Sequence, residues 1–388
     1  MRILQIFNQY RFRGGEEAWV DGLASLLGDS AIVDELRFHS DDWLGSGAPS
    51  VLKQICLIGN NPESRAQLRA KVAEFKPDVL LFHNVLPVGS LGLFQEAKSL
   101  GIPVWCYTHN FRPFSPGGTL WTGESVNDAA LRGNPWPEIF QGAWMGSPIK
   151  TAILAWHLYR ARKNGLIECV DRWLAISHFM KETLSEAGIP SEKIDVVRHC
   201  WDAGAETPQQ EEGSHYLFLG RLVKEKGVLN LMDAWRIVEE SLGDACPHLI
   251  IAGDGPEMER MQEMAETLKH VRFVGFIQGA EKQALMNKCR ALMVPSICWE
   301  TLGLTVLEAY AVNRPVIAAK SGALQETVLD GTTGWLHEPG NPADLARAII
   351  AAEKAGNDER ARRGKEGNRW LKENASPTDW KRQFLMEP

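Results

Sequence analysis

Short apolar runs alternate with longer stretches of helical periodicity, and this alternation limits most strongly how the 388-residue chain can fold. A short apolar run between two helical patterns is typical of a buried strand in a parallel sheet, because each parallel connection needs a crossover. In the first half we expect strands at 3–7, 79–82, 104–108, 173–176 and 194–197, and helices at 15–27, 90–99 and 150–164. This order predicts one parallel sheet covered by helices.

The same order restarts after the polar stretch 205–214, whose Pro, Gln, Glu and Gly residues are typical of a linker. Here we expect strands at 216–219, 249–252, 271–274, 291–294 and 316–318, and helices at 228–239, 257–269, 304–311, 343–353 and 359–371. The chain is therefore predicted to be α/β, with two Rossmann-like doubly wound domains at 1–205 and 206–370 that face an interdomain cleft. The tail at 371–388 is expected to pack back on the first domain.

Composition and charge exclude several classes of protein. Apolar residues make up 44% and charged residues 23% of the chain, as in ordinary globular proteins, and the net charge of −7 comes without a basic tail that would indicate a nucleic-acid partner. The seven cysteines form no C-x-x-C pair, which favours a reducing compartment. With no long apolar segment and no signal-peptide pattern, we expect a cytoplasmic protein.

The turn after the first predicted strand contains Gly14 and Gly15 but not the G-x-G-x-x-G pattern of dinucleotide-binding domains. No P-loop pattern is present either. The hypothesis that the chain is a nicotinamide-dependent dehydrogenase therefore loses its main support.

Two cations follow the first strand of the second domain. Arg221 and Lys226 lie five residues apart on a strand-to-helix loop, where a guanidinium fork and an ammonium can hold a diphosphate between them. The alternative is a solvated loop that carries two ordinary charges, and this segment taken alone leaves both interpretations open.

Two carboxylates give an independent indication. Glu308 lies on the apolar stripe of a helix that is expected to start near Thr301, and a buried carboxylate there needs hydrogen-bonding partners such as sugar hydroxyls. Glu300 comes just before that helix, whose first turn is expected to present the backbone N–H groups of Thr301, Leu302, Gly303 and Leu304 to an anion. Alternatively, Glu300 is a favourable acid at a helix start and Glu308 is a salt-bridge partner.

Taken together, these segments resemble the retaining family 4 glycosyltransferases of GT-B fold. The resemblance rests on Glu300-x7-Glu308, on Arg221 with Lys226, and on Gly253-Asp-Gly-Pro256. It extends over nearly the whole chain, because Gly14-Gly15 match the amino-terminal glycine loop of the family, and 321–326 and 330–334 match its later blocks.

The resemblance implies a role for each matching residue of the second domain. Arg221 and Lys226 would bind the nucleotide diphosphate, Glu308 would accept the ribose hydroxyls, and Glu300 would contact the donor sugar. Main-chain atoms near Phe276 and Ile277 would read the base.

In the first domain, His109 lies in a segment that resembles the histidine segment of the family, and would touch the donor sugar or shape the acceptor side. A structural histidine is the alternative. No D-x-D triplet occurs, so we expect no metal and no cofactor, with the diphosphate charge met by cations and a helix start.

An insertion at about 111–165 is rich in tryptophan. Aromatic side chains beside cations suit the surface of an anionic membrane, whereas core packing or an acceptor pocket would also explain them. The residues are Trp121, Trp136, Trp144 and Trp156, with Lys150, Arg160, Arg162 and Lys163.

We therefore expect a retaining hexosyltransferase that uses a UDP- or GDP-linked sugar. Its acceptor would be a sugar or lipid-linked sugar in the synthesis of cell-surface polysaccharide or glycolipid, and the protein would contact an anionic membrane peripherally at the cytoplasmic face. A nucleotide-sugar epimerase, which converts the donor without an acceptor, and a non-catalytic sugar-binding partner are the alternatives.

Overall fold

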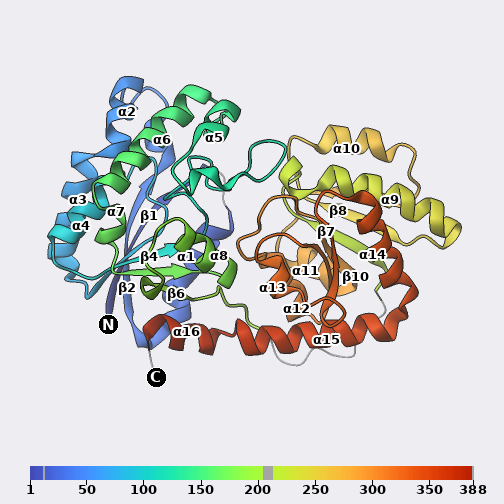
Figure 1. Ribbon diagram of the computed structural model, residues 1–388. Helices are drawn as coiled ribbons and strands as arrows, with labels where there is room; N and C mark the ends of the chain where they lie inside the picture. The colour runs from blue at the N-terminus through green and yellow to red at the C-terminus, as the bar shows by residue number, and fades with distance from the viewer. Residues whose placement is uncertain (12–13, 204–212, 387–388) are drawn as a thin grey trace. The chain divides into compact units, whose positions relative to one another are not determined.

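The computed structural model describes residues 1–11, 14–203 and 213–386, which form two compact units (Figure 1). The first unit contains 1–122 and 127–197, and the second contains 123–126 and the described residues from 198 onward. The predicted linker 205–214 lies outside the described residues except for Gly213 and Ser214.

The first unit is built on a parallel sheet with the strand order β2-β1-β3-β4-β5-β6. The strands are β1 (Arg2–Gln9), β2 (Ile32–His39), β3 (Val79–Phe82), β4 (Val104–Thr108), β5 (Arg172–Ala175) and β6 (Ile194–Val196). The helices are α1 (Gly15–Leu27), α2 (Val51–Gly59), α3 (Pro62–Phe75), α4 (Gly92–Ser99), α5 (Trp136–Gln141), α6 (Pro148–Lys163), α7 (Leu166–Cys169) and α8 (His178–Glu186). Strands β3, β4 and β5 are buried along their whole length, as expected where helices cover both faces of a parallel sheet.

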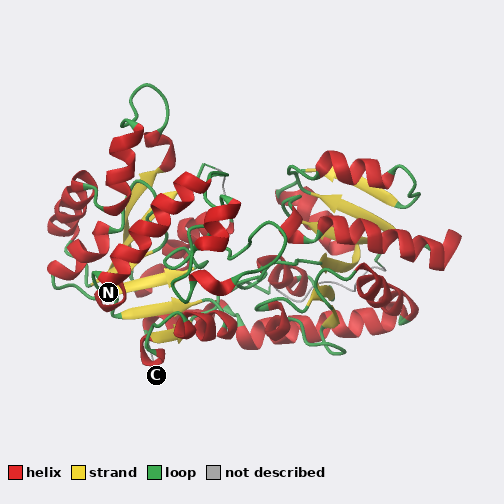
Figure 2. Cartoon of the chain, turned by 45° about the horizontal axis from the view of Figure 1, so that its top comes forward, coloured by secondary structure: helices red, strands yellow, loops and turns green. Residues whose placement is uncertain are grey.

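The second unit repeats this plan with the strand order β12-β11-β10-β7-β8-β9. Its strands are β7 (His215–Leu219), β8 (His248–Ala252), β9 (Val271–Gly275), β10 (Cys289–Val294), β11 (Val316–Ala319) and β12 (Gly334–His337). Its helices are α9 (Val228–Leu242), α10 (Met258–Ala265), α11 (Gly279–Lys288), α12 (Leu304–Ala311), α13 (Leu324–Thr327), α14 (Pro342–Lys354), α15 (Gly356–Asn374) and α16 (Pro377–Leu385). Figure 2 shows each sheet flanked by helices.

The sequence located the inner strands well, but it missed elements at the edges of both sheets. No strand was expected at β2 or β12, and no helix at α2, α3 or α11. Edge strand β2 has the mixed sequence IVDELRFH and an exposed Ile32, so it lacks the continuous apolar run that marks an inner strand. Strand β12 begins with a glycine and has only four residues.

Helix α16 is grouped with the second unit by its contacts, and its Trp380 and Phe384 are buried and stacked on each other. The packing of this tail on the first domain stays a prediction. In the described residues, none of the helices is both long enough and apolar enough to cross a membrane.

The core of the second unit forms where α9 packs on the sheet. Its buried residues Val228, Leu231, Trp235 and Val238 follow the helical repeat, and the Trp235 ring meets the Tyr216 ring of β7 edge to face at 5.8 Å. This contact packs the middle of α9 against the sheet.

We predict that Trp235→Ala lowers the unfolding free energy by about 3–5 kcal/mol, because it leaves a large cavity in a fully buried core. Trp136→Ala is the matched control, since Trp136 is 59% exposed and its loss should change the unfolding free energy by no more than about 0.5 kcal/mol. Urea denaturation followed by circular dichroism measures both variants. Equal effects would contradict this assignment of the core.

Candidate active site

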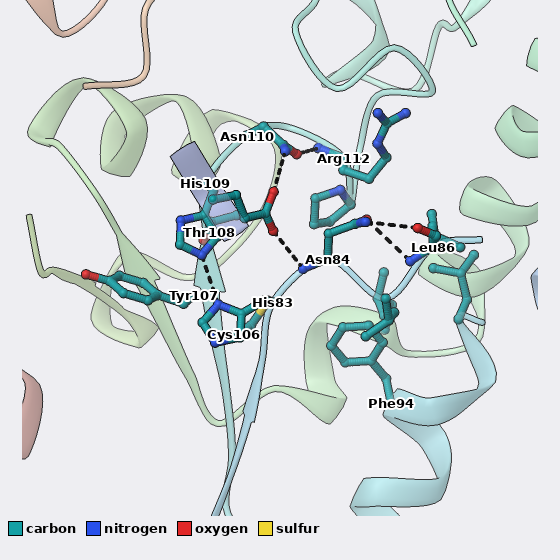
Figure 3. A pocket seen from close by; sticks show the side chains of 15 residues that line it. His83, Asn84, Leu86, Phe94, Cys106, Tyr107, Thr108, His109, Asn110 and Arg112 are labelled. Atoms are coloured by element: carbon teal, nitrogen blue, oxygen red, sulfur yellow. Dashed lines mark hydrogen bonds between the residues drawn. The ribbon is translucent and has the colours of Figure 1, made fainter. Parts of the chain in front are cut away.

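Two histidines lie at the carboxyl ends of neighbouring strands in the first unit (Figure 3). His83 follows β3 and His109 follows β4, and the two rings stack with centroids 5.2 Å apart. The Nδ1 atom of His83 is 2.9 Å from the Nε2 atom of His109, so one of these nitrogens donates a hydrogen bond to the other. Burial lowers the pKa of His109 to about 3 and that of His83 well below its usual value, so both rings are neutral near pH 7.

One hydrogen bond couples the two rings. Its direction depends on the tautomers, because either Nδ1 of His83 or Nε2 of His109 can donate. The Nε2 atom of His83 is buried and has no hydrogen-bond partner among the described residues. This pairing fixes the orientation of His109, the histidine singled out from the sequence.

Glu16, in the first turn of α1, lies beside these histidines and was not singled out from the sequence. Its carboxylate accepts hydrogen bonds from the backbone N–H of Asn84 at 3.1 Å, from the Tyr10 hydroxyl at 3.0 Å and from the side chain of Asn110 at 3.4 Å. Burial nevertheless raises the pKa of Glu16 to about 7. In the sequence, an acid in the first turn of a helix looks like an ordinary partner of the helix dipole, so no local signal marks it.

These groups line a small cavity together with Thr108 and Arg112 (Figure 3). Its volume of about 30 Å³ fits one or two waters. A ligand larger than this would therefore lie at the mouth of the cavity and place a single hydroxyl among the polar groups. A neutral histidine and a carboxyl that titrates near pH 7 can both exchange hydrogen bonds with such a hydroxyl.

In the second unit, Lys226 and Glu300 form an ion pair. The Nζ atom of Lys226 is 2.6 Å from Oε1 of Glu300, which also accepts a hydrogen bond from the Ser296 hydroxyl. Burial opposes the charge on both groups, but their mutual attraction holds the pKa of Glu300 below and that of Lys226 above the usual value. The bond to Glu300 uses one of the three N–H donors of the ammonium, so the others can serve a phosphate.

The backbone after Lys226 is brought close to this pair by Gly227. Its φ of +68° lies in the left-handed region, and a Cβ at this position would lie 2.0 Å from the carbonyl oxygen of Pro295, just after β10. Only glycine permits this approach of the Lys226 loop to the segment that carries Ser296 and Glu300.

Arg221, the second predicted phosphate ligand, follows β7 and is exposed. Its guanidinium lies 3.8 Å from the carboxylate of Glu225, and the Arg221 side chain is 69% exposed, so this ion pair is weak. The loop of Arg221 lies against the Gly253-Asp-Gly motif, since Gly220 donates its N–H to Ala252 and Leu222 to Asp254. The structure therefore brings Arg221 and Lys226 onto one loop at the carboxyl edge of the sheet.

Glu308 is paired with a lysine that the sequence did not indicate. Its Oε2 atom is 2.6 Å from Nζ of Lys282, on the missed helix α11, and the carboxylate is 12% exposed. The structure therefore shows the alternative role expected for Glu308, that of a salt-bridge partner. Binding of the ribose hydroxyls by Glu308 stays a prediction.

The helix that carries Glu308 begins later than expected. Helix α12 starts at Leu304, and Gly303 precedes it with a left-handed φ of +83°. Thr301 and Leu302 lie before this turn, so the prediction that their N–H groups form the first helical turn is wrong. The reason is the glycine, whose conformation interrupts the helical path.

The remaining predicted residues are at two loops. Phe276 follows β9 with its ring 74% exposed, whereas Ile277 beside it is buried. Gly14 precedes α1, Gly15 is its first residue, and a Cβ at Gly14 would meet no atom of the described chain within 4 Å. An exposed aromatic ring and open backbone both leave room for a ligand.

One group of potential metal ligands occurs in the described part of the chain, formed by Glu239, Cys246 and His270. It lies near the starts of β8 and β9, at the opposite edge of the sheet from Arg221 and Lys226. The carboxylate of Glu239 accepts the backbone N–H groups of Lys269 and His270, so it already stabilises the turn before β9.

Comparisons with known proteins agree with this architecture. The structure of Anabaena HepE in complex with UDP and glucose superposes with a TM-score of 0.69 at 18% identity, covering 100% of this chain and 98% of that one. Two parallel α/β units of this kind define the GT-B fold of glycosyltransferases, which confirms the predicted fold class.

Sequence models then place the chain in a family. Residues 202–370 match the model described as glycosyl transferases group 1, and residues 45–203 match that of glycosyltransferase family 4. The chain belongs to this glycosyltransferase family, as predicted from its motifs.

The curated relatives are similar over shorter stretches. Phosphatidyl-myo-inositol mannosyltransferase of Mycobacterium leprae is 34% identical over 140 residues, which cover 36% of this chain and 37% of the relative. Glycogen synthase of Mycobacterium tuberculosis is 32% identical over 199 residues, 49% of this chain and 47% of the relative. In both cases the match spans less than half the length of the relative.

We predict that the pKa of Glu16 makes the stability of the first unit pH-dependent. Because the folded unit holds this proton more tightly than the unfolded chain, the stabilising contribution is complete below about pH 4.5 and is lost as the pH rises through about 7. The side chain of Glu16→Gln does not titrate. The unfolding free energy of the variant minus that of wild type should therefore be about 2–3 kcal/mol larger at pH 8 than at pH 5. Urea unfolding at both pH values measures this, and parallel pH profiles would refute it.

Proposed function

We propose that this protein transfers a hexose from a nucleotide-diphosphate sugar, UDP- or GDP-linked, to a sugar or lipid-linked sugar acceptor with retention of anomeric configuration. The pathway we propose is the synthesis of cell-surface polysaccharide or glycolipid. The observation that carries the proposal is the partly buried Lys226–Glu300 ion pair, with Arg221 on the same loop as Lys226, in a chain of this family.

The donor half of the reaction belongs to the second unit in this proposal. Arg221 and Lys226 neutralise the diphosphate as the bond between the sugar carbon and the phosphate oxygen breaks. Glu300 holds the Lys226 ammonium and contacts the donor sugar. Glu308 accepts the ribose hydroxyls, and the exposed ring of Phe276 offers a surface on which the base can stack.

The acceptor half belongs to the first unit. The acceptor hydroxyl attacks the sugar carbon on the face that the diphosphate leaves, and its proton passes to the departing phosphate oxygen. His109, held by His83, orients a hydroxyl through a neutral ring, and Glu16 offers a second polar contact in the same cavity. No divalent metal is needed in this proposal, because two cations meet the charge of the leaving group.

The names of similar proteins support a nucleotide-sugar donor and a membrane-associated acceptor. HepE has been solved with UDP and with UDP-glucose, and the mycobacterial relative is a mannosyltransferase of a phosphatidylinositol lipid by name. UDP-glucose is therefore the first donor to test, and a GDP-linked hexose, the other donor that we propose, is the second.

A screen of nucleotide sugars tests the function directly. A donor that binds the native state raises the melting temperature, and release of nucleoside diphosphate that requires an added acceptor demonstrates transfer. Conversion of the donor sugar without an acceptor would indicate the epimerase instead. Failure of every nucleoside diphosphate to bind would favour a non-catalytic partner.

We predict that Arg221→Ala and Lys226→Ala each weaken nucleoside diphosphate binding by about 1.5–3 kcal/mol, the contribution of a hydrogen bond to a charged group. Lys224→Ala is the matched control, because Lys224 is an exposed cation in the same turn as Lys226. Calorimetry with and without a chelator gives the affinities. Wild-type affinity in both variants, or loss of all binding in the chelator, would refute the clamp.

We predict different defects for the two carboxylates. Glu300→Gln should lower kcat at least about tenfold with a smaller change in nucleoside diphosphate affinity, since it acts at the donor sugar. Glu308→Gln should mainly weaken nucleotide binding, by about 1–2 kcal/mol, because the contact with the ribose is lost.

Lys282→Gln separates the two roles of Glu308, because it removes the observed salt bridge and keeps the carboxylate. Affinity close to wild type in Lys282→Gln is expected if Glu308 binds the ribose. An equal loss of affinity in Lys282→Gln and Glu308→Gln would assign Glu308 to structure alone.

A further inference from the structure

The solvent-facing side of α6 carries large apolar side chains. Ile149, Ile153 and Trp156 follow each other at helical spacing, and Ile149 is 75% and Trp156 51% exposed. A helix on the surface of a globular protein normally turns this stripe toward the core. Helix α6 buries its opposite side through Leu154 and Leu158, so the outward apolar stripe is additional to its core contacts.

Helices α2 and α5 extend this stripe to both sides. In α2, Val51 and Leu52 are exposed, and in α5 the exposed rings of Trp136 and Phe140 stack with centroids 5.8 Å apart. Of the fifteen large apolar side chains that are exposed in the described residues, eight belong to this surface. They are Val51, Leu52, Trp136, Phe140, Met145, Ile149, Trp156 and Tyr159.

Direct contacts hold the three helices together (Figure 1). His157 of α6 lies against Gly59 of α2, and its Nε2 atom is 2.8 Å from the carbonyl oxygen of Ile55. On the other side, Trp144, just after α5, donates its backbone N–H to the Thr151 hydroxyl of α6. The exposed side chains are therefore presented by one packed layer.

The exposed charges of the three helices are all positive. The exposed ionised side chains of the three helices are Lys53, Lys150, Arg160 and Lys163. The one acid within them, Glu138, is buried and accepts hydrogen bonds from Ser115 and Gly117. A chain with a net charge of −7 thus has a locally cationic surface.

We propose that the face formed by α2, α5 and α6 docks on the surface of an anionic lipid bilayer. Tryptophan and tyrosine favour the boundary between headgroups and acyl chains, and cations around them attract anionic lipid within a Debye length. The guanidinium of Arg160 lies 4.9 Å from the centre of the Trp156 ring, so one cation accompanies an inserting aromatic side chain. The inference rests on this surface and not on the transfer site.

The structure narrows the set of residues expected from the sequence. Trp136 and Trp156 are exposed, but Trp121 and Trp144 are half-buried and contribute little to the face. Arg162 points inward, where its guanidinium donates to the carbonyl oxygens of Leu131 and Ala187. The exposed apolar face instead includes Phe140, Ile149 and the first turn of α2.

Vesicle co-sedimentation of the full chain, without nucleotide or acceptor, tests the docking. Wild type should bind phosphatidylglycerol vesicles more tightly than phosphatidylcholine vesicles, and salt at about 1 M, where the Debye length is about 3 Å, should lower binding at least about tenfold. The double variant Lys150→Gln, Arg160→Gln should weaken binding about 25-fold, because each cation near the surface contributes about fivefold.

The combination Trp136→Ala, Phe140→Ala and Trp156→Ala should weaken binding at least about tenfold, because it removes the apolar anchors. Ile32→Ala is the matched control, since Ile32 is 59% exposed on edge strand β2 of the same unit and should leave binding unchanged. Equal binding of wild type and the aromatic variant would overturn the proposal. So would a wild-type dimer that the aromatic variant loses, because a second copy would then cover this face.

Discussion

The candidate donor site depends on the partly buried ion pair between Lys226 and Glu300. Removing either partner alone would leave the other charge partly buried and unpaired, which is unfavourable. The pair requires Gly227, whose missing side chain lets the Lys226 loop approach Pro295 and the segment that ends in Glu300. The shape of the loop therefore determines the positions of the Lys226 ammonium and the Glu300 carboxylate together.

The two units carry different electrostatics at their sheet edges. The second unit offers Arg221 and Lys226, which suit a diphosphate, whereas the first offers a neutral histidine pair and a carboxyl whose pKa is about 7. Arg112 also lines this cavity, but the two histidines are neutral, and neutral donors and acceptors suit a hydroxyl. This division of charge supports the assignment of the donor to one unit and the acceptor to the other.

The sequence was sufficient for the parts of the molecule that local pattern determines. The inner strands were predicted because buried parallel strands are continuous apolar runs, and so was the position of Arg221 and His109 just after strands. The roles of these residues stay predictions. Long-range partners were not predictable. His83, Glu16 and Lys282 come from other elements, and no local spacing links them to His109 or Glu308. The start of α12 was also missed, since the conformation of Gly303 depends on its surroundings.

A double-mutant cycle on Lys226 and Glu300, with nucleoside diphosphate affinity as the readout, tests the central claim most directly. In the Lys226→Ala background, the unpaired Glu300 carboxylate would repel the diphosphate, so adding Glu300→Gln should restore part of the lost affinity. We expect the two effects to deviate from additivity by at least about 1 kcal/mol. Additivity within about 0.5 kcal/mol would show that the pair does not position the ammonium for the diphosphate.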